Sequence, residues 1–207
     1  KKKLSNVLIA DKKLENQKYK SKYIKMFKSL IISLFLILPL SVNATQMQCH
    51  GQAKHWRDVA YSTGPMSKYK DLRKCIAWTA YQFNLPEELM YAMLDVERGP
   101  INGTCKTNKN GTQDCGPAQI NDVRLKELRQ FELTKSDIKS KPCHNMWAMG
   151  YLLRREIEKA GGKIWRGVGN YHYHYSVNPE IHNRYIRKVK SSWRKLNRKI
   201  ENYCSQR

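Results

Sequence analysis

The stretch Glu97–Asn121, ERGPINGTCKTNKNGTQDCGPAQIN, decides how the rest of the chain is arranged. It begins with a carboxylate at the end of an apolar helical pattern, which Gly99-Pro100 stops. An Asn-Gly pair then lies between Cys105 and Cys115, and this spacing predicts a small β-hairpin with a tight turn. We therefore expect a helix, a hairpin and the polar loop that follows the hairpin to meet here.

Apolar residues at three- and four-residue spacing predict helices on both sides of this stretch. The helix that begins at Pro86 and ends at Glu97 has the widest apolar face and is expected to be mostly buried. The other expected elements are a helix over 68–83, a helix from an Asp122 cap to Phe131, a short turn capped by Thr134 or Ser136, helices over 144–160 and 164–170, a loop over 171–176, and a helix from Pro179 to about 202. The predicted fold is mainly α with one small hairpin.

Residues 26–44 have the pattern of an export signal. Within residues 26–44, the apolar run at 30–40 follows Lys28, and Val42-Asn43-Ala44 fits a cleavage site of small residues. An apolar run of 11 residues that contains a proline is too short to span a bilayer, although an uncleaved membrane anchor is the alternative. We interpret residues 1–25 as an upstream or extended N-terminal region, and expect cleavage near Ala44 and export to the periplasm or cell envelope.

The chain after residue 44 is strongly basic. Residues 1–44 hold 10 of the 39 basic and 2 of the 17 acidic residues, which leaves 29 basic and 15 acidic residues and a net charge of +14. This charge would attract a polyanion, and for an exported protein the cell wall or phospholipid headgroups are better candidates than nucleic acid, for which no recognition motif is present. The basic residues are spread through the expected helices and do not form one stripe, which favours a solvated cationic surface. We expect an irregular arm over 45–67 and one folded domain over 68–207.

All six cysteines follow the expected cleavage point, which fits three disulfides formed in an oxidising compartment. Cys105 and Cys115 would face each other across the hairpin, and Cys49 and Cys204 would join the two ends of the domain. That assignment leaves Cys75 with Cys143, although six cysteines allow about 15 pairings. A zinc site is the alternative, but no Cys-x-x-Cys motif supports it.

Glu97 is placed for acid–base chemistry. Cleavage of a glycosidic bond needs a carboxyl group that stays protonated near neutral pH, and burial against apolar side chains has that effect. Glu97 follows Met93, Leu94 and Val96 and precedes a helix stop, so its surroundings would be apolar on one side and open on the other. Without further information, a solvated surface carboxylate is the more common role for a glutamate.

Four motifs occur in a familiar order: Glu97-Arg98-Gly99, Asn110-Gly111-Thr112-Gln113-Asp114, Gly116-Pro117-Ala118-Gln119-Ile120-Asn121 and Cys143-His144-Asn145. Together they resemble the catalytic domain of the soluble lytic transglycosylases, over about residues 68–190. The likeness is strongest to the small branch associated with type IV secretion, conjugation and pilus systems. It implies a lysozyme-like α-helical fold, stabilised by disulfides and carrying the hairpin at its cleft, with no metal and no other cofactor.

The resemblance also implies a reaction. Glu97 matches the single catalytic acid/base of the family, which cleaves peptidoglycan between N-acetylmuramic acid and N-acetylglucosamine. It would protonate the glycosidic oxygen and then, as a carboxylate, take the proton of the muramoyl 6-hydroxyl group, so that a 1,6-anhydro sugar forms. The N-acetyl group of the substrate assists, so a second catalytic carboxylate is not required. Asp114 is interpreted as a support for the loop.

Further positions match substrate-binding residues of the family. Gln119 and Asn121 correspond to its polar loop beside the scissile bond, with helix capping as the alternative for Asn121. The segment Val168-Gly169-Asn170-Tyr171, with the histidines and serine after it and Pro179 and Tyr185 beyond, resembles the family's tyrosine–histidine–serine loop. Tyr171 is expected to donate to the catalytic carboxylate or the sugar, and either His172 or His174 fills the family position. Arg98 stands where many relatives have serine, so the hydrogen bond which that serine would give to orient the acid is missing.

Two alternatives remain beside the transglycosylase, which would open the wall locally for a secretion or conjugation apparatus. One is a hydrolytic lysozyme, which differs in its product. The other is a cationic wall-binding assembly protein without turnover. A metal site formed by His172, His174 and His182, or binding to nucleic acid, is a more distant possibility.

Overall fold

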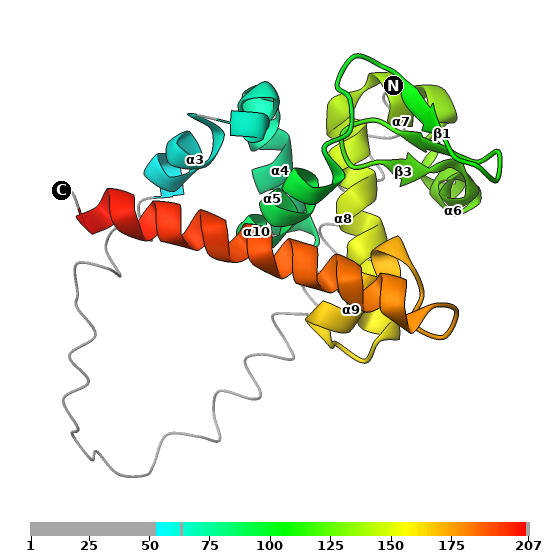
Figure 1. The fold of residues 1–207 in the computed structure, drawn as a ribbon. Helices are drawn as coiled ribbons and strands as arrows, with labels where there is room; N and C mark the ends of the chain where they lie inside the picture. Colours follow the sequence, from blue (N-terminus) through cyan, green and yellow to red (C-terminus); the bar gives the residue numbers. More distant parts are fainter. Residues whose placement is uncertain (1–52, 63, 206–207) are drawn as a thin grey trace, which may run out of the picture. The chain divides into compact units, whose positions relative to one another are not determined.

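The apolar helix that ends at Glu97 lies at the centre of the fold. A computed structural model describes residues 53–62 and 64–205, all of which belong to the unit Asn43–Arg207. Helix α5, Glu87–Glu97, buries six consecutive residues, Leu89 to Leu94, which is why its sequence is so apolar. Helix α10, Pro179–Ser205, packs along α5 and also contacts α9 and α3 (Figure 1).

Two helices far apart in the sequence pack closely on the other side of the core. Helix α4, Arg73–Gln82, lies against α8, Pro142–Lys159, and Gly150 allows the contact because a Cβ atom there would collide with Thr79 and Phe83. Helix α9, Ile164–His172, packs against α8 and α10. The 27 residues of α10 span about 40 Å, so this helix reaches both α3, at the start of the described chain, and α9, which comes directly before it.

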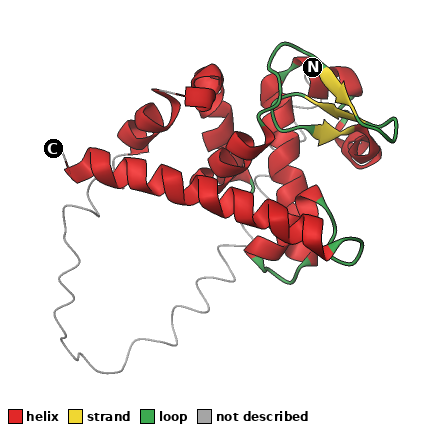
Figure 2. Cartoon of the chain, in the orientation of Figure 1, coloured by secondary structure: helices red, strands yellow, loops and turns green. Residues whose placement is uncertain are grey.

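The sheet has three short antiparallel strands in the order β1-β2-β3 (Figure 2). Strands β1, Cys105–Thr107, and β2, Gln113–Cys115, form the expected hairpin with Cys105 opposite Cys115. Strand β3, Ile120–Asn121, is not predicted from the sequence, because two residues are too few to show an alternation. Asp114 pairs with Asn121 across β2 and β3, so the last two residues of the polar loop belong to the sheet.

Several boundaries differ from those expected. The described part of segment 45–67 is helical and not irregular: α3 covers Ala53–Ser62 and a 3₁₀ helix, η1, covers Gly64–Leu72. The helix expected over 68–83 is therefore divided between η1 and α4. The weak periodicity of residues 45–67 does not indicate a helix, because tertiary contacts bury side chains in this region, among them Trp56, Tyr61 and the following Tyr69.

The region after β3 is also corrected. Asn121, and not Asp122, caps the next helical segment, since its side chain accepts a hydrogen bond from the backbone of Val123. That segment consists of η2, Asp122–Arg124, α6, Leu125–Leu128, and η3, Arg129–Phe131. Thr134 forms a capping box with Asp137 at the start of α7, Lys135–Ser140, as one of the two expected caps.

Two disulfides link the described elements. One joins Cys75 of α4 to Cys143 of α8, and the other joins Cys105 to Cys115 across the hairpin. These are two of the three pairs expected from the sequence. The third, Cys49 with Cys204, lies outside the residues whose side chains are described, as do the predicted signal and the N-terminal region.

The mainly helical class with a small antiparallel sheet is thereby confirmed, and the lysozyme-like fold remains a prediction. Within the residues that the structure describes, no helix is both long enough and apolar enough to cross a membrane.

Candidate active site

Glu97 is the last residue of α5, and the backbone after it turns sharply away. Arg98 takes up the left-handed conformation (φ 49°) and its N–H donates to the carbonyl of Leu94, which closes the helix. The Arg98 side chain folds back on Asp95, to which it donates at 2.6 Å (backbone oxygen) and 3.1 Å (carboxylate). Arg98 therefore does not replace the missing serine as a partner of Glu97.

Tyr185 of α10 supplies the contact that orients Glu97. Its hydroxyl group donates to Oε1 of Glu97 at 2.5 Å, across 88 positions of the chain. Tyr185 is buried, and burial together with the nearby Glu97 raises its pKa well above the ordinary value, so it stays a donor. The ring of His172 stacks on that of Tyr185 with centroids 4.4 Å apart. The close packing of α5 against α10 thus fixes the carboxyl group from the side.

The surroundings of Glu97 favour its protonated form. Burial raises the pKa of this carboxyl group to about 7, and the nearby Asp114 adds to the rise, while the hydrogen bond from Tyr185 and the charge of Lys188 oppose it. The side chain nevertheless remains partly exposed. A carboxyl group that titrates near pH 7 and is open to solvent on one side can both give and take a proton.

Tyr171 lies near Glu97 but has another partner. Its hydroxyl group donates to the carbonyl of Ala118 at 3.1 Å, and burial, followed by the charge of Glu97, raises its pKa well above the ordinary value. The role of donor to the carboxylate, expected for Tyr171, therefore falls to Tyr185 in this structure. Tyr171 instead connects α9 to the polar loop.

The polar loop is fixed to the end of α5 by backbone contacts. The N–H of Gly99 donates to the carbonyl of Pro117 at 3.0 Å, and a Cβ atom at Gly99 would collide with the carbonyls of Gly116 and Pro117. Gln119 has a left-handed backbone (φ 50°), and its Nε2 donates to the carbonyl of Gly116 at 3.0 Å. The loop that carries Gln119 is thus held directly beside Gly99, two residues after Glu97.

Asn145 holds the same loop from the opposite side. It is fully buried on α8, where its Oδ1 accepts from the N–H of Ala118 and its Nδ2 donates to the carbonyls of Cys115 and Ile138, at 2.8, 2.9 and 3.0 Å. The motif Cys143-His144-Asn145 therefore has a physical role, since one residue forms a disulfide and the other satisfies three buried backbone groups.

The hairpin and β3 share a network of polar side chains. Asp114 accepts hydrogen bonds at both oxygens, from Asn121 at 2.7 Å and Asn108 at 2.9 Å. Asn121 also donates to Thr112 and caps η2, so its side chain is occupied within the protein. Of the two roles considered for Asn121, capping is the one that the structure displays. Asp114 is likewise engaged on both oxygens, as a support for the loop would be.

The two histidines considered for the site lie in different surroundings. His172 is exposed on one side, but desolvation of its stacked ring, with the charge of Lys188, lowers its pKa, so it is neutral near pH 7. His174 shares a hydrogen bond of 2.7 Å with Ser176. Both line a hollow of about 290 Å³ together with Arg124, Glu156, Lys159, Asn170 and Tyr173. Only His172 contacts the side chain that orients Glu97.

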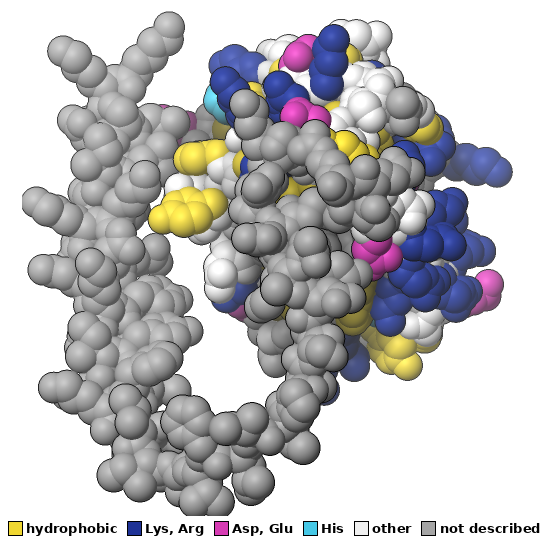
Figure 3. Space-filling model, turned by 90° about the vertical axis from the view of Figure 1, so that its left-hand side faces the viewer, with side chains coloured by type: hydrophobic (Ala, Val, Ile, Leu, Met, Phe, Trp, Pro, Cys, Tyr) yellow, Lys and Arg dark blue, Asp and Glu magenta, His cyan; other side chains and the backbone are white. Residues whose placement is uncertain are grey.

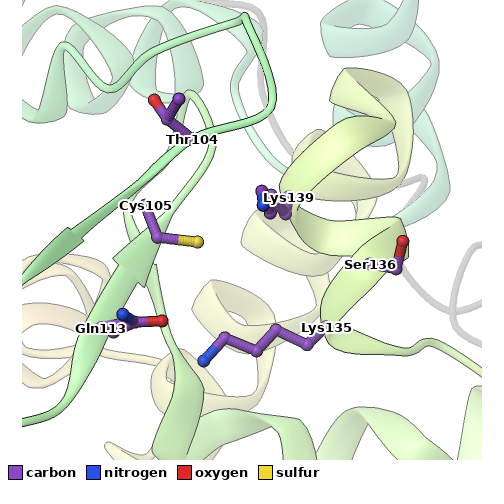
Figure 4. Close-up of a pocket in the computed structure, with 6 residues that line it drawn as sticks. All are labelled: Thr104, Cys105, Gln113, Lys135, Ser136 and Lys139. Atoms are coloured by element: carbon purple, nitrogen blue, oxygen red, sulfur yellow. The ribbon is translucent and has the colours of Figure 1, made fainter.

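A second hollow, of about 550 Å³, lies between the hairpin and α7 (Figure 4). Thr104, Cys105 and Gln113 line it on the side of the hairpin, and Lys135, Ser136 and Lys139 on the side of α7. Because neighbouring residues of a strand point to opposite faces, Gln113 and Asp114 lie on different faces of β2. This hollow is thus separate from the group around Glu97.

No metal site is formed by the candidate histidines. His182 is buried, with Nδ1 3.0 Å from the carbonyl of Tyr173, while His172 stacks on Tyr185. Among the described residues, no three His, Cys, Asp or Glu side chains are grouped so that they could hold a metal ion.

No protein-family model matches the chain. The chain is 30% identical over 115 residues to the invasion protein IagB of Salmonella typhimurium (strain SL1344), a match that covers 55% of this chain and 71% of IagB. It is also 30% identical over 128 residues to protein IpgF of Shigella flexneri, and this match covers 58% of this chain and 83% of IpgF. The chain therefore belongs to the family that includes the invasion protein IagB and protein IpgF.

Proposed function

We propose that the protein is a peptidoglycan lytic transglycosylase in which Glu97 is the only acid/base. The observation that carries this proposal is the hydrogen bond of 2.5 Å from Tyr185 to a partly exposed Glu97 whose pKa is raised to about 7. Near neutral pH such a carboxyl group is present in both protonation states. It can therefore act first as acid and then as base within one catalytic cycle.

The reaction is the cleavage of the β-1,4 bond between N-acetylmuramic acid and N-acetylglucosamine. Protonated Glu97 gives its proton to the glycosidic oxygen as the bond to the anomeric carbon breaks. The resulting carboxylate takes the proton of the muramoyl 6-hydroxyl group, whose oxygen bonds to the anomeric carbon and closes the 1,6-anhydro ring. The proton lost in the first step is regained in the second, so Glu97 ends in its starting state.

The surroundings of Asp114 favour this mechanism over hydrolysis by two carboxylates. Asp114 is near enough to influence the pKa of Glu97, but both of its oxygens accept hydrogen bonds from asparagines of the hairpin and β3. A carboxylate held in this way supports the loop and is a poor nucleophile. Neutral His172 and the Gln119 loop, which lie beside the Glu97–Tyr185 pair, are the surfaces on which we place the sugars.

The cellular role follows from the family and the expected export signal. The relatives include a protein named for invasion, and we propose that this chain acts in the periplasm or cell envelope, where it opens the wall locally for a secretion, conjugation or pilus apparatus. Purified peptidoglycan incubated with wild type and Glu97→Gln tests the chemistry. Anhydro-muropeptides from wild type alone would support it, whereas release of soluble products by Glu97→Gln would contradict it.

A further inference from the structure

Helix α10 carries a cationic face, contrary to the expectation that the basic residues form no stripe. Seven of its eight basic residues fall within an arc of about 140° when placed at 100° per residue. We call these the cationic stripe: Arg184, Arg187, Lys188, Arg194, Lys195, Arg198 and Lys199, all of which are exposed. The opposite side of the helix is buried through Tyr185, Val189, Leu196 and Ile200. The expectation that the basic residues form no stripe is thus corrected for this helix.

The cationic stripe is hardly neutralised by acidic neighbours. Within 4.0 Å, the ion pairs of the described residues give it only one partner, Glu180, which lies 3.8 Å from Arg184. No acidic residue occurs between positions 181 and 200. Helix α8 is different, because its half-buried Arg154 pairs with Glu158 at 2.9 Å. Figure 3 shows Lys and Arg side chains gathered densely on one side of the molecule, with few acidic side chains among them.

The cationic stripe begins at the candidate active site. Arg184 and Lys188 lie on either side of Tyr185 in the sequence, and Tyr185 donates to Glu97. The charges of Lys188 and Arg184 both lower the pKa of His172, whose ring stacks on Tyr185, and the charge of Lys188 also lowers that of Glu97. From Arg184 the stripe continues for 15 residues to Lys199, or about 22 Å along the helix.

We propose that the cationic stripe binds the carboxylate groups of the peptide stems on the glycan strand that Glu97 cleaves. This inference rests on the proposed function, because it makes the stripe an extension of the same site. A strand bound across Glu97 and Tyr185 can continue along α10, and its regularly spaced peptides present carboxylates to the exposed cations. A phospholipid surface fits less well, since a planar membrane on α10 would cover the site next to Arg184 and Lys188.

The test measures binding apart from catalysis. In a Glu97→Gln background, sedimentation with insoluble peptidoglycan sacculi gives an affinity for the parent and for a stripe variant, Arg194→Gln/Lys195→Gln/Arg198→Gln/Lys199→Gln. These four residues are exposed and lie at the end of the stripe remote from Tyr185. The matched control, Lys70→Gln/Lys74→Gln/Lys106→Gln/Lys109→Gln, removes the same charge from exposed positions on other elements.

We expect the stripe variant to bind sacculi roughly tenfold more weakly, as four solvent-screened ionic contacts would give, and the control less than about twofold more weakly. Sacculi whose peptide carboxyl groups have been converted to amides should bind the parent as weakly as the stripe variant. Equal losses in both variants, or a stripe effect that survives amidation, would overturn the proposal. Loss of binding to anionic phospholipid vesicles with unchanged binding to sacculi would overturn it in favour of a membrane surface.

Failure of the proposed function would be recognised separately. Stripe-dependent binding to sacculi by a wild-type protein that releases no anhydro-muropeptides would refute the role of Glu97 and support the stripe. Release of those products with unchanged binding of the stripe variant would support Glu97 and refute the stripe.

Discussion

Replacement of Glu97 by glutamine should stabilise the folded protein, and by an amount that depends on pH. The carboxyl group has a pKa of about 7 in the folded protein and an ordinary value of 4.5, so folding favours its protonated form. Below pH 4.5 the group is neutral in both states and contributes no penalty. As the pH rises from 4.5 to 7, the unfolded chain ionises first, and the folded state loses stability relative to it.

The magnitude follows from the difference between the two pKa values. A difference of about 2.5 corresponds to about 3 kcal/mol, and this is the upper limit of the penalty at pH 8. Glutamine is nearly isosteric and cannot ionise, and its amide oxygen can still accept from Tyr185. Glu97→Gln should therefore unfold with a free energy up to about 3 kcal/mol higher than wild type at pH 8, and with almost the same free energy at pH 4.

Urea unfolding followed by circular dichroism, with the disulfides intact, measures both values. Glu132→Gln is the matched control, because Glu132 is exposed and its side chain forms no ion pair among the described residues, so its effect should be nearly the same at the two pH values. If the difference between Glu97→Gln and wild type were equal at pH 4 and pH 8, the carboxyl group would not be disfavoured by burial, and the account of Glu97 as an acid would fail.

Three further substitutions test how the site is held together. Tyr185→Phe removes a hydrogen bond that lowers the pKa of Glu97. The alkaline limb of the pH–activity profile should therefore move up by about one pH unit. An unchanged limb would contradict the contact between Tyr185 and Glu97. Asn145→Ala leaves three buried backbone groups without their hydrogen-bond partner. The free energy of unfolding, measured by urea titration, should fall by about 3 kcal/mol. A loss below about 1 kcal/mol would show that the loop does not depend on Asn145. Gly99→Ala places a Cβ atom against the carbonyls of Gly116 and Pro117. The displaced loop should lower muropeptide release by about tenfold or more. Release at the wild-type level would show that the position of the loop is not critical.

The sequence predicted the centre of the fold because the signals there are local. The apolar positions of α5 and the Gly99-Pro100 stop placed Glu97 at a helix end, and the Asn-Gly pair between two cysteines predicted the hairpin. Each of these features is encoded within a dozen neighbouring residues. Helix α3 was not predicted because Tyr61 packs on Tyr91, a contact between segments 30 positions apart.

The parts of the site that were assigned differently depend on packing between distant segments. Tyr171 and Tyr185 both occur in the motif-bearing region, but only the packing of α10 on α5 decides which hydroxyl group meets Glu97. The sequence cannot decide the cap of η2, since Asn121 and Asp122 are both suitable residues, and the pairing of β3 with β2 makes Asn121 the cap. The cationic stripe could have been predicted, because a helix from Pro179 to about 202 already assigns its residues to faces at 100° per residue.

The most direct test of the central claim is liquid chromatography and mass spectrometry of the products released from purified peptidoglycan. We expect 1,6-anhydro-muropeptides from the wild-type protein and none from Glu97→Gln, with the mutant folded as judged by circular dichroism. Muropeptides with ordinary reducing ends from the wild type, or anhydro products from Glu97→Gln, would contradict it.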